Sequence, residues 1–334
     1  MTSDKKHPVL IIGSGRSGTT FLAKLLDSSP DVLYRHEPDF SHVNSEIPFL
    51  VELDDLEKYK KQASQYYGDL LCERSWKTAA RLPVFPKNYR SRFEKLLYEI
   101  IIYASKLPYA KKMLPPQIPD LLARNANPVY VIKSVNSICR AALFLEAIPD
   151  LKVIHIVRHP CAVISSLIEG HVKGLMANEV YMDALFSMRN INGYGISYEM
   201  MESFSKEEKV AFQWMVMNNK IADEAGKYSS RYMRVHYEEL CHDVAGQTKK
   251  IYDHCGLNWN AQTQDFIDRM KNVDQKKASY FSVNRNPKSA IFKWRGKLPV
   301  ETQAKIIELV SGSDVGRQTC STVQMIEDLN WECH

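Results

Sequence analysis

Apolar and polar positions change their spacing several times along this chain of 334 residues. Short β-branched apolar runs predict buried strands, which we place at 9–12, 129–133, 152–157 and 231–237, with a shorter one at 32–34. Segments with apolar residues three and four positions apart predict helices. These are expected at about 19–27, 54–72, 90–106, 138–147, 160–167, 205–226, 245–255, 262–271 and 300–310. Strands that alternate with helices in this way favour right-handed crossovers and a parallel sheet.

The first strand leads into the stretch around which the chain is organised. The run Val9–Ile12 breaks at Gly13, passes through a Gly/Ser-rich turn and re-enters a helical pattern at Phe21. A strand, loop and helix in this order direct backbone N–H groups and the positive end of a helix dipole at one point. Thr19 and Thr20 add hydroxyl donors in the first helical turn. The loop therefore predicts an anion site suited to phosphate.

The loop has nearly the spacing of the nucleoside-triphosphate P-loop, with Gly13 and Gly18 in the two glycine positions. Thr19 stands where that motif requires Lys, and the only cation of the loop is Arg16. Without that Lys an ATPase or kinase loses its contact with the β- and γ-phosphates. Triphosphate chemistry is therefore disfavoured, and a tight glycine turn without a ligand stays an alternative for this segment alone.

Cations recur at the ends of the predicted strands. Arg16 follows the first strand, Lys133 ends the strand at 129–133, and Arg158 follows the strand at 152–157. Ligands of open parallel sheets bind at the carboxyl ends of the strands. A Mg-dependent NTPase would place an acidic ligand there, and neither later strand supplies one. The site is therefore expected to hold a multiply charged anion through Arg, Lys and backbone contacts, without a metal.

Composition narrows the class of protein. With 45% hydrophobic and 25% charged residues the chain is an ordinary globular protein, and its net charge of +5 is too small to indicate nucleic acid. The seven cysteines are dispersed without a C-x-x-C pair, which disfavours a metal cage or a dense disulfide framework and leaves a single bridge open. The N-terminus is polar and no membrane segment is found, so the cytoplasm is the expected compartment.

At this point the residues resemble a known family, the sulfotransferases that use 3′-phosphoadenosine 5′-phosphosulfate (PAPS). The loop Gly15–Leu22 is similar to their 5′-phosphosulfate motif. The stretch Val157–Ser166 is similar to their 3′-phosphate motif, in which an Arg and a Ser, here Arg158 and Ser166, grip the 3′-phosphate.

Two later positions extend the resemblance toward the C-terminus. Tyr237 is similar to the tyrosine that contacts adenine, and the stretch Trp294–Lys297 resembles a late basic loop that closes over the cofactor. The resemblance implies that the cofactor-binding residues are Gly15, Arg16, Ser17, Gly18, Thr19, Thr20, Phe21, Arg158, Ser166, Tyr237, Arg295, Gly296 and Lys297. Phe21 stays open between an adenine contact and ordinary core packing.

The resemblance also implies the architecture. We expect an α/β fold in which a P-loop-like parallel sheet is flanked by helices, forming one enlarged domain over 8–320. Insertions are expected at about 41–127 and 172–205, and 321–334 would form a C-terminal tail. PAPS would be the donor and 3′-phosphoadenosine 5′-phosphate (PAP) the product.

Sulfuryl transfer builds negative charge on the oxygen that leaves with the nucleotide, so a fixed cation there lowers the barrier. Arg16 is the first candidate for that cation and Lys133 the second. Many small-molecule relatives carry a His base two residues after the lysine that matches Lys133, but Val135 stands there. Glu37 is therefore the predicted base, since carbohydrate-type relatives carry a Glu in this region, with His36 as the alternative.

The acceptor is the least determined part. Arg16 in place of the usual lysine, and the pair Glu37–Pro38, resemble the carbohydrate-directed branch. A small-molecule alcohol, phenol or amine is the alternative acceptor. A nucleotide kinase and a non-catalytic nucleotide-binding module are more distant alternatives.

Overall fold

The structure is a computed structural model that describes residues 6–107, 116–174, 181–271 and 287–331. Its centre is a parallel sheet with the strand order β2-β3-β1-β4-β5. The strands are β1 Val9–Ile12, β2 Val32–His36, β3 Val129–Ser134, β4 Lys152–Val157 and β5 Tyr232–His236. The predicted parallel α/β sheet is confirmed, and β2 runs two residues farther than its apolar pattern indicated.

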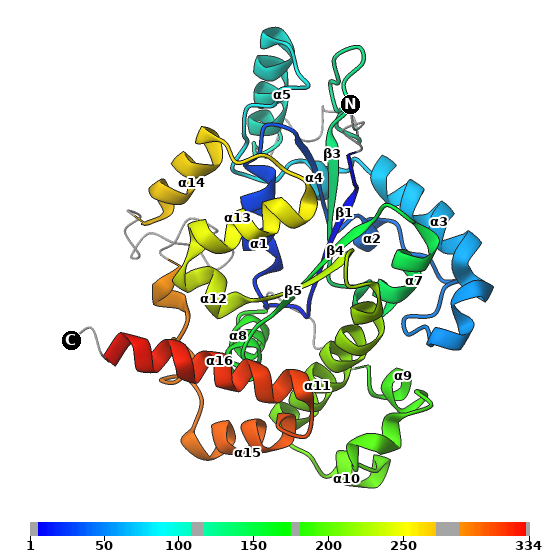
Figure 1. The fold of residues 1–334 in the computed structure, drawn as a ribbon, viewed down its shortest axis with the longest axis vertical. Helices are drawn as coiled ribbons and strands as arrows, with labels where there is room; N and C mark the ends of the chain where they lie inside the picture. Colours follow the sequence, from blue (N-terminus) through cyan, green and yellow to red (C-terminus); the bar gives the residue numbers. More distant parts are fainter. Residues whose placement is uncertain (1–5, 108–115, 175–180, 272–286, 332–334) are drawn as a thin grey trace.

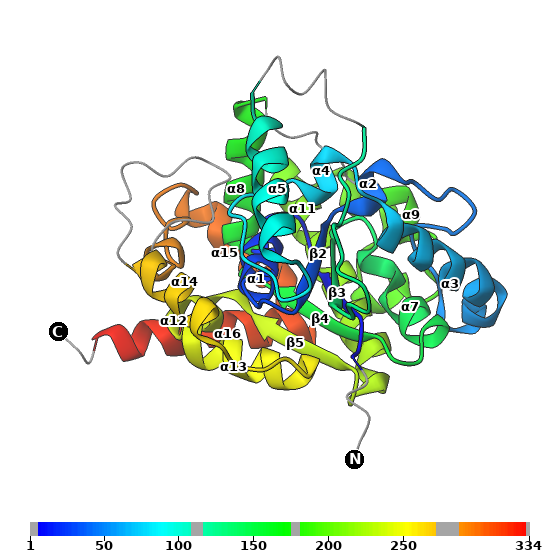
Figure 2. The same ribbon diagram turned by 90° about the horizontal axis from the view of Figure 1, so that it is seen from above.

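Helices cover both faces of the sheet (Figures 1 and 2). The first half of the chain carries α1 Thr19–Asp27, α2 Pro38–Ser41, α3 Leu56–Cys72, α4 Trp76–Ala79, α5 Arg92–Ala104, α7 Ala141–Ala147 and α8 Pro160–Val172. The second half carries α9 Met182–Phe186, α10 Tyr198–Glu202, α11 Lys206–Ala225, α12 Tyr237–His242, α13 Val244–Cys255, α14 Ala261–Lys271, α15 Val300–Val310 and α16 Asp314–Trp331.

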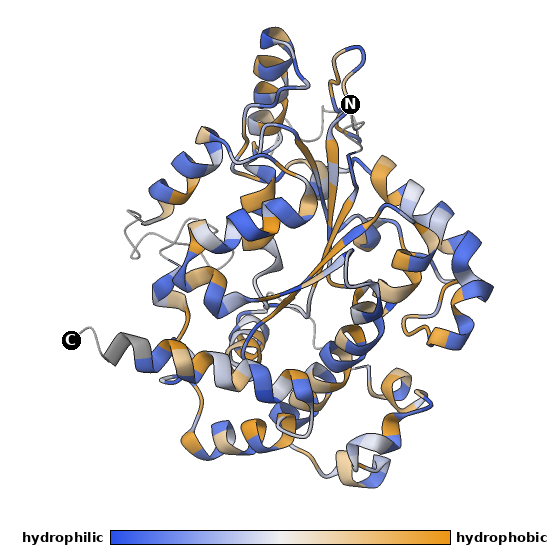
Figure 3. Cartoon of the chain, viewed as in Figure 1, coloured by the Kyte–Doolittle hydropathy of each residue, from blue (hydrophilic) through white to orange (hydrophobic). Residues whose placement is uncertain are grey.

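The alternation of side chains along the strands divides the core into two layers. Leu10 and Ile12 of β1 face one layer, with α3, α7, α8 and α11, whereas Val9 and Ile11 face the other, with α1, α12, α13 and α14. All four side chains are buried. Figure 3 shows the consequence, with apolar strands at the centre and helices of mixed hydropathy around them. Two-sided burial explains why these strands are continuous apolar runs.

Local signals located several helices. Ser205 and Glu208 form the predicted capping box that opens α11. The helix predicted over 138–147 begins as a 3-10 turn, Ile138–Arg140, before α7. Among the described residues of the insertion at 41–127 the predicted helices α3 and α5 are present, with one isolated bridge between Ser75 and Gln117.

Among the described residues, the helices α2, α4, α9, α10, α12 and α16 were not predicted. α12 begins at Tyr237, directly after β5, and α16 buries Val315, Val323 and Ile326. α16 continues through residue 320, where the sequence placed the start of a tail. The insertion at 172–205 contains the short helices α9 and α10, and its residues 175–180 lie outside the described ones.

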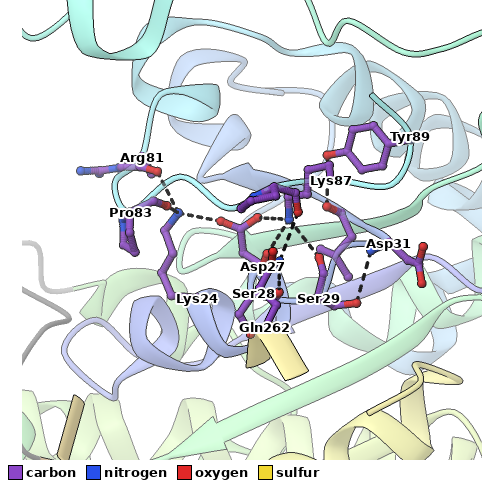
Figure 4. Close-up of polar contacts among 12 residues, drawn as sticks. Lys24, Asp27, Ser28, Ser29, Asp31, Arg81, Pro83, Lys87, Tyr89 and Gln262 are labelled. Carbon is purple, nitrogen blue, oxygen red and sulfur yellow. Dashed lines mark hydrogen bonds and ion pairs between the residues drawn. The ribbon is translucent and has the colours of Figure 1, made fainter. Parts of the chain in front are cut away.

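A buried charge cluster anchors part of the first insertion to the end of α1 (Figure 4). Lys24 donates to Asp27 Oδ2 at 2.7 Å and to the carbonyls of Arg81 and Pro83 at 2.8 and 3.0 Å. Lys87 donates to Asp27 Oδ1 at 2.9 Å and to the carbonyl of Ser29 at 3.1 Å. Because both ammonium groups are surrounded by acceptors, the segment from Arg81 to Lys87 is held firmly on the C-terminal turn of α1.

Candidate active site at the carboxyl edge of the sheet

The five parallel strands end at one edge of the sheet, and each delivers one predicted site element there. In the order of the strands these are Glu37 after β2, Lys133 in β3, the loop 13–18 after β1, Arg158 after β4 and Tyr237 after β5. Neighbouring strands lie about 4.8 Å apart, so three intervals separate Glu37 from Arg158 by about 14 Å. The edge therefore carries a predicted base at one side and the predicted 3′-phosphate residues at the other, with the glycine loop between them.

Two glycines of the loop are required by close neighbours. A Cβ on Gly13 would lie 2.5 Å from the carbonyl oxygen of Ile156. Gly18 has a φ of +94°, and a Cβ there would lie 2.3 Å from the ring of Tyr237. A Cβ on Gly15 would meet nothing within 4 Å. Gly13 and Gly18 thus let the loop pack against β4 and α12, whereas Gly15 lies on the open side of the loop.

The donors of the loop differ in how they are used. The backbone N–H of Ser17 donates to the carbonyl of Ser14 at 3.1 Å, and its hydroxyl donates to the same carbonyl at 2.6 Å. Both donors of Ser17 are therefore engaged within the turn. Thr19 and Thr20 open α1, where the first amides have no acceptor within the helix. Thr19 and Thr20 therefore stay the predicted phosphate donors of the loop.

Arg158 forms the centre of the contacts on the β4 side. Its guanidinium donates to the carbonyl of Arg16 at 3.0 Å and to that of Ala290 at 3.3 Å, and it lies 4.4 Å from the centroid of the Tyr237 ring. Tyr237 meets the ring of Phe21 edge-on at 6.3 Å. The predicted 3′-phosphate arginine and the predicted adenine residues thus share one wall.

Arg16 points toward that same wall. Its Nε donates to Ser166 Oγ on α8 at 2.9 Å, and its φ of 70° is left-handed. The sequence assigned Arg16 and Ser166 to opposite ends of the cofactor, whereas the structure brings them into direct contact. Lys133, on β3 at the other side of the loop, is the cation that forms an ion pair with Glu37.

Glu37 and Lys133 form an ion pair. The Lys133 ammonium donates to Glu37 Oε1, and the Glu37 amide donates to the Lys133 carbonyl at 2.7 Å. The Lys133 side chain is 3% exposed and the Glu37 side chain 18%. Burial raises the pKa of Glu37, but the charge and hydrogen bond of Lys133, with Lys77 and Arg81, outweigh burial and lower it overall. Glu37 is thus an ionised carboxylate that solvent can reach.

His36 is less suited to accept a proton. Arg81 donates to its Nε2 at 2.6 Å, and its Nδ1 lies 2.6 Å from the Tyr34 hydroxyl. Burial, followed by the charges of Lys133 and Arg81, holds the pKa of His36 well below its usual range. The ring is neutral with its accepting nitrogen occupied, so the geometry favours Glu37 over this alternative.

Two buried carboxylates at the edge were not identified from the sequence. Asp39 accepts hydrogen bonds from Ser134 and, at 2.8 Å, from Ser137, which ties the turn after β2 to the turn after β3. Glu238 accepts a hydrogen bond from the His159 amide at 3.0 Å, beside Arg158. Burial raises the pKa of both. Each lies shortly after a strand end, but nothing in the sequence distinguishes them from surface carboxylates.

The late basic loop lies beside Arg158. Trp294 stacks on His159 with the ring centroids 4.5 Å apart. Arg295 pairs with Glu327, Lys297 pairs with Glu169, and Gly296 between them is exposed. The structure thus brings the predicted loop to the predicted side of the site, where its two cations rest on carboxylates of α16 and α8.

The comparisons with known proteins identify the family. The model of the sulfotransferase family matches residues 8–261. The chain belongs to the sulfotransferase family. The resemblance seen in the sequence is thereby confirmed, together with the predicted enzyme class, a transferase that takes its sulfuryl group from PAPS and releases PAP.

Individual relatives of this sulfotransferase are distant. It is 23% identical over 350 residues to human carbohydrate sulfotransferase 5, covering 93% of this chain and 76% of that protein. It is 24% identical over 267 residues to the omega-hydroxy-beta-dihydromenaquinone-9 sulfotransferase of Mycobacterium bovis, covering 75% of this chain and 63% of that one.

Among solved structures, the sulfotransferase domain of the Synechococcus PCC 7002 olefin synthase aligns with a TM-score of 0.45 at 17% identity. The alignment covers 93% of this chain and 96% of that chain. A mouse sulfotransferase complexed with PAP aligns with a TM-score of 0.43 at 14% identity, over 95% and 89% of the two chains.

The edge of the sheet fits a bisphosphorylated nucleotide. Arg158 Nε and Ser14 Oγ are buried polar atoms that have no hydrogen-bond partner among the described residues. Buried donors of this kind are costly unless a ligand satisfies them.

None of the helices in the described ranges is both long enough and apolar enough to cross a membrane.

Proposed function

We propose that this sulfotransferase moves the sulfuryl group of PAPS to an acceptor hydroxyl, with Glu37 as the general base. The observation that carries the proposal is the Glu37–Lys133 pair at the end of β2 and β3, next to the anion-binding loop. It supplies an ionised, partly exposed carboxylate and a buried cation within one hydrogen bond of each other. In-line transfer requires a proton acceptor at the attacking oxygen and positive charge at the leaving oxygen, so in the proposed step Lys133 exchanges its contact with Glu37 for the bridging oxygen.

The proposed step joins one proton transfer to the exchange of one bond at sulfur. Glu37 accepts the proton of the acceptor hydroxyl while the acceptor oxygen forms a new bond to sulfur. The bond from sulfur to the bridging oxygen of the nucleotide breaks, and PAP leaves with that electron pair. Lys133 donates to the bridging oxygen as its negative charge grows, and Arg16 contributes there when its side chain turns away from Ser166. Positive charge at this point lowers the barrier because it stabilises the negative charge that develops on the bridging oxygen.

The remaining predicted residues bind and orient the nucleotide. We assign the 5′-phosphate to the loop that contains Gly15, Ser17 and Gly18, with Thr19 and Thr20 as its hydroxyl and amide donors. Arg158 and Ser166 are assigned to the 3′-phosphate. Phe21 and Tyr237 are assigned to the adenine, because they meet edge-on beside Arg158. The late basic loop closes over the nucleotide in this scheme through Arg295, Gly296 and Lys297. Arg295 then releases Glu327, and Lys297 releases Glu169, to contact the nucleotide.

For the acceptor we propose a carbohydrate hydroxyl. The Arg16 and Glu37–Pro38 pattern supports it, and a human carbohydrate sulfotransferase is among the relatives of the chain. The second candidate is a small-molecule alcohol, which is favoured by the mycobacterial relative whose name specifies a hydroxylated quinone. Transfer of labelled sulfate from PAPS to desulfated glycans, alcohols and phenols, assayed side by side, distinguishes the two.

The role of Glu37 is tested by Glu37→Gln. We expect turnover to fall at least 100-fold, as is typical when a general base is removed, while PAP affinity changes less than threefold. The control is Glu46→Gln, an exposed position of the same insertion, which should turn over like the original protein. Single-turnover kinetics and calorimetry measure the two quantities. Near-normal turnover by Glu37→Gln would remove Glu37 from the role.

The nucleotide assignment is tested by calorimetry with PAP and AMP. We expect PAP to bind at least tenfold more tightly in the absence of Mg²⁺, because Arg158 and Ser166 add charge-assisted hydrogen bonds to the 3′-phosphate. Arg158→Gln should bring the two affinities close together. Equal affinities in the original protein, or a requirement for Mg²⁺, contradict the assignment.

A further inference from the structure

The side of Glu37 that faces the first insertion carries positive charge without matching negative charge. Lys77 on α4 and Arg81 after it both act on the Glu37 carboxylate. Arg81 lies 2.6 Å from His36 Nε2, which lies 3.6 Å from Glu37 Oε2, so its guanidinium is within about 6 Å of the proposed base. Helix α4, which carries Lys77, packs on β2, and Arg81 follows shortly after this helix.

Neither cation is neutralised by a carboxylate ion pair within the described part of the chain. The Arg81 guanidinium contacts His36, and the Lys77 ammonium lies 2.8 Å from the centroid of the Phe40 ring. In contrast, Arg295 and Lys297 on the nucleotide side are both paired with carboxylates. Burial lowers the pKa of Lys77, and Glu37 offsets that effect only in part.

The remaining charges of this region do not cancel the excess. Asp39 is buried and already accepts hydrogen bonds from Ser134 and Ser137. Glu37 is paired with Lys133. Arg81 is exposed, and Phe40 is 59% exposed beside Lys77. An accessible guanidinium, an ammonium group and an apolar ring thus lie together next to the proposed base.

We infer that the acceptor carries an anionic group, a carboxylate or a sulfate, which Lys77 and Arg81 bind while its hydroxyl faces Glu37. This inference rests on the proposed function, because it assigns the acceptor to the side of Glu37 away from the nucleotide. A planar guanidinium binds carboxylate and sulfate through paired hydrogen bonds, and a ring such as Phe40 offers a flat apolar contact for a sugar or aryl face. A neutral acceptor would leave both cations without a carboxylate or sulfate ion-pair partner.

The test compares acceptors that differ only in charge, on the enzyme saturated with PAP. One pair is methyl glucuronide and methyl glucoside, and the other is 4-hydroxyphenylacetate and its amide. Saturation-transfer NMR titrations give the dissociation constants without requiring turnover. We expect the anionic member of at least one pair to bind at least tenfold more tightly. Tighter binding of the anion in the sugar pair, in the phenol pair or in both supports the inference. It also shows whether the charged group of the acceptor is carried by a sugar or by an aromatic ring.

Variants then assign the preference to the two cations. Arg81→Gln and Lys77→Gln should each reduce the preference at least threefold, and the double variant should abolish it. Arg81→Lys should restore part of it, because the charge is kept. Lys61→Gln, an exposed lysine on α3, is the matched control and should keep the full preference.

The outcomes separate this inference from the proposed function. Equal affinities within both pairs, no detectable binding of either anion, or a preference that survives the double variant would overturn the anionic acceptor while PAP binding persists. Loss of PAP binding by the original protein would overturn the proposed function instead.

Discussion

At the scale of single residues, Gly18 joins the loop to the wall that holds Arg158. Its φ of +94° is a conformation that side chains disfavour, and a Cβ would lie 2.3 Å from Tyr237. We expect Gly18→Ala to lower the free energy of unfolding by about 2 kcal/mol or more, because backbone strain and a ring clash add up. PAP affinity should fall as well, since displacing Tyr237 disturbs Arg158. Urea denaturation and calorimetry measure the two effects.

Gly15 provides the contrast within the same loop. A Cβ there would meet no atom within 4 Å, so Gly15→Ala should change the free energy of unfolding by less than about 0.5 kcal/mol. The difference between the two alanine variants isolates the requirement for glycine at position 18. Equal destabilisation by both variants would contradict this explanation.

At the scale of elements, the C-terminal turn of α1 and the segment from Arg81 to Lys87 depend on Asp27. This carboxylate accepts hydrogen bonds from two buried ammonium groups, Lys24 and Lys87. Burial lowers the pKa of Lys87 to about 8 although Asp27 opposes it. We expect Asp27→Asn to cost about 3–5 kcal/mol of unfolding free energy, because both lysines lose the charge that compensates their burial.

The matched control for that element is Asp31→Asn. Asp31 accepts a hydrogen bond from Asn88 at 3.1 Å in an exposed setting, so its loss should cost less than about 0.5 kcal/mol. Thermal or urea denaturation measures both variants. A small effect of Asp27→Asn would mean that the cluster does not anchor the insertion. Because that insertion also carries Arg81, the anchor links the stability of α1 to the proposed acceptor side.

At the scale of the whole molecule, buried histidines make stability depend on acidity. Burial lowers the pKa of His155 and His159 to about 3 and that of His236 to about 4. Below pH 6.5 the unfolded chain therefore binds protons that the folded chain does not. The free energy of unfolding should fall as the pH drops from about 6.5 toward 4, by up to about 1.4 kcal/mol per pH unit for each histidine.

His155→Gln tests this dependence at one site. His155 lies between Asn218 Oδ1 and the Tyr232 hydroxyl, each at 2.9 Å, and glutamine offers a donor and an acceptor without titrating. We expect the variant to be less stable at pH 7.5 and to lose stability less steeply between pH 6.5 and 5. Urea denaturation at several pH values measures the slope, and an unchanged slope would exclude His155 as a contributor.

The sequence by itself determined the parts of this sulfotransferase that depend on neighbours along the chain. The apolar runs located every strand of the sheet. The central strand β1 is apolar throughout because it is buried on both faces, whereas β2 and β5 also contain arginine and histidine. The capping box at Ser205 and the glycine loop were recognised because their hydrogen bonds and backbone conformations involve residues only a few positions apart. The family followed from two such local motifs, around Arg16 and Arg158.

The tertiary structure alone decided which side chains meet. Glu37 and Lys133 are paired across 96 positions, and Arg16 reaches Ser166 across 150, so no local pattern indicates either contact. α12 and α16 were missed because packing against distant segments stabilises them. The sheet order brings five strand ends to one edge, and that order, which arises from the burial of whole layers, is what gathers the site.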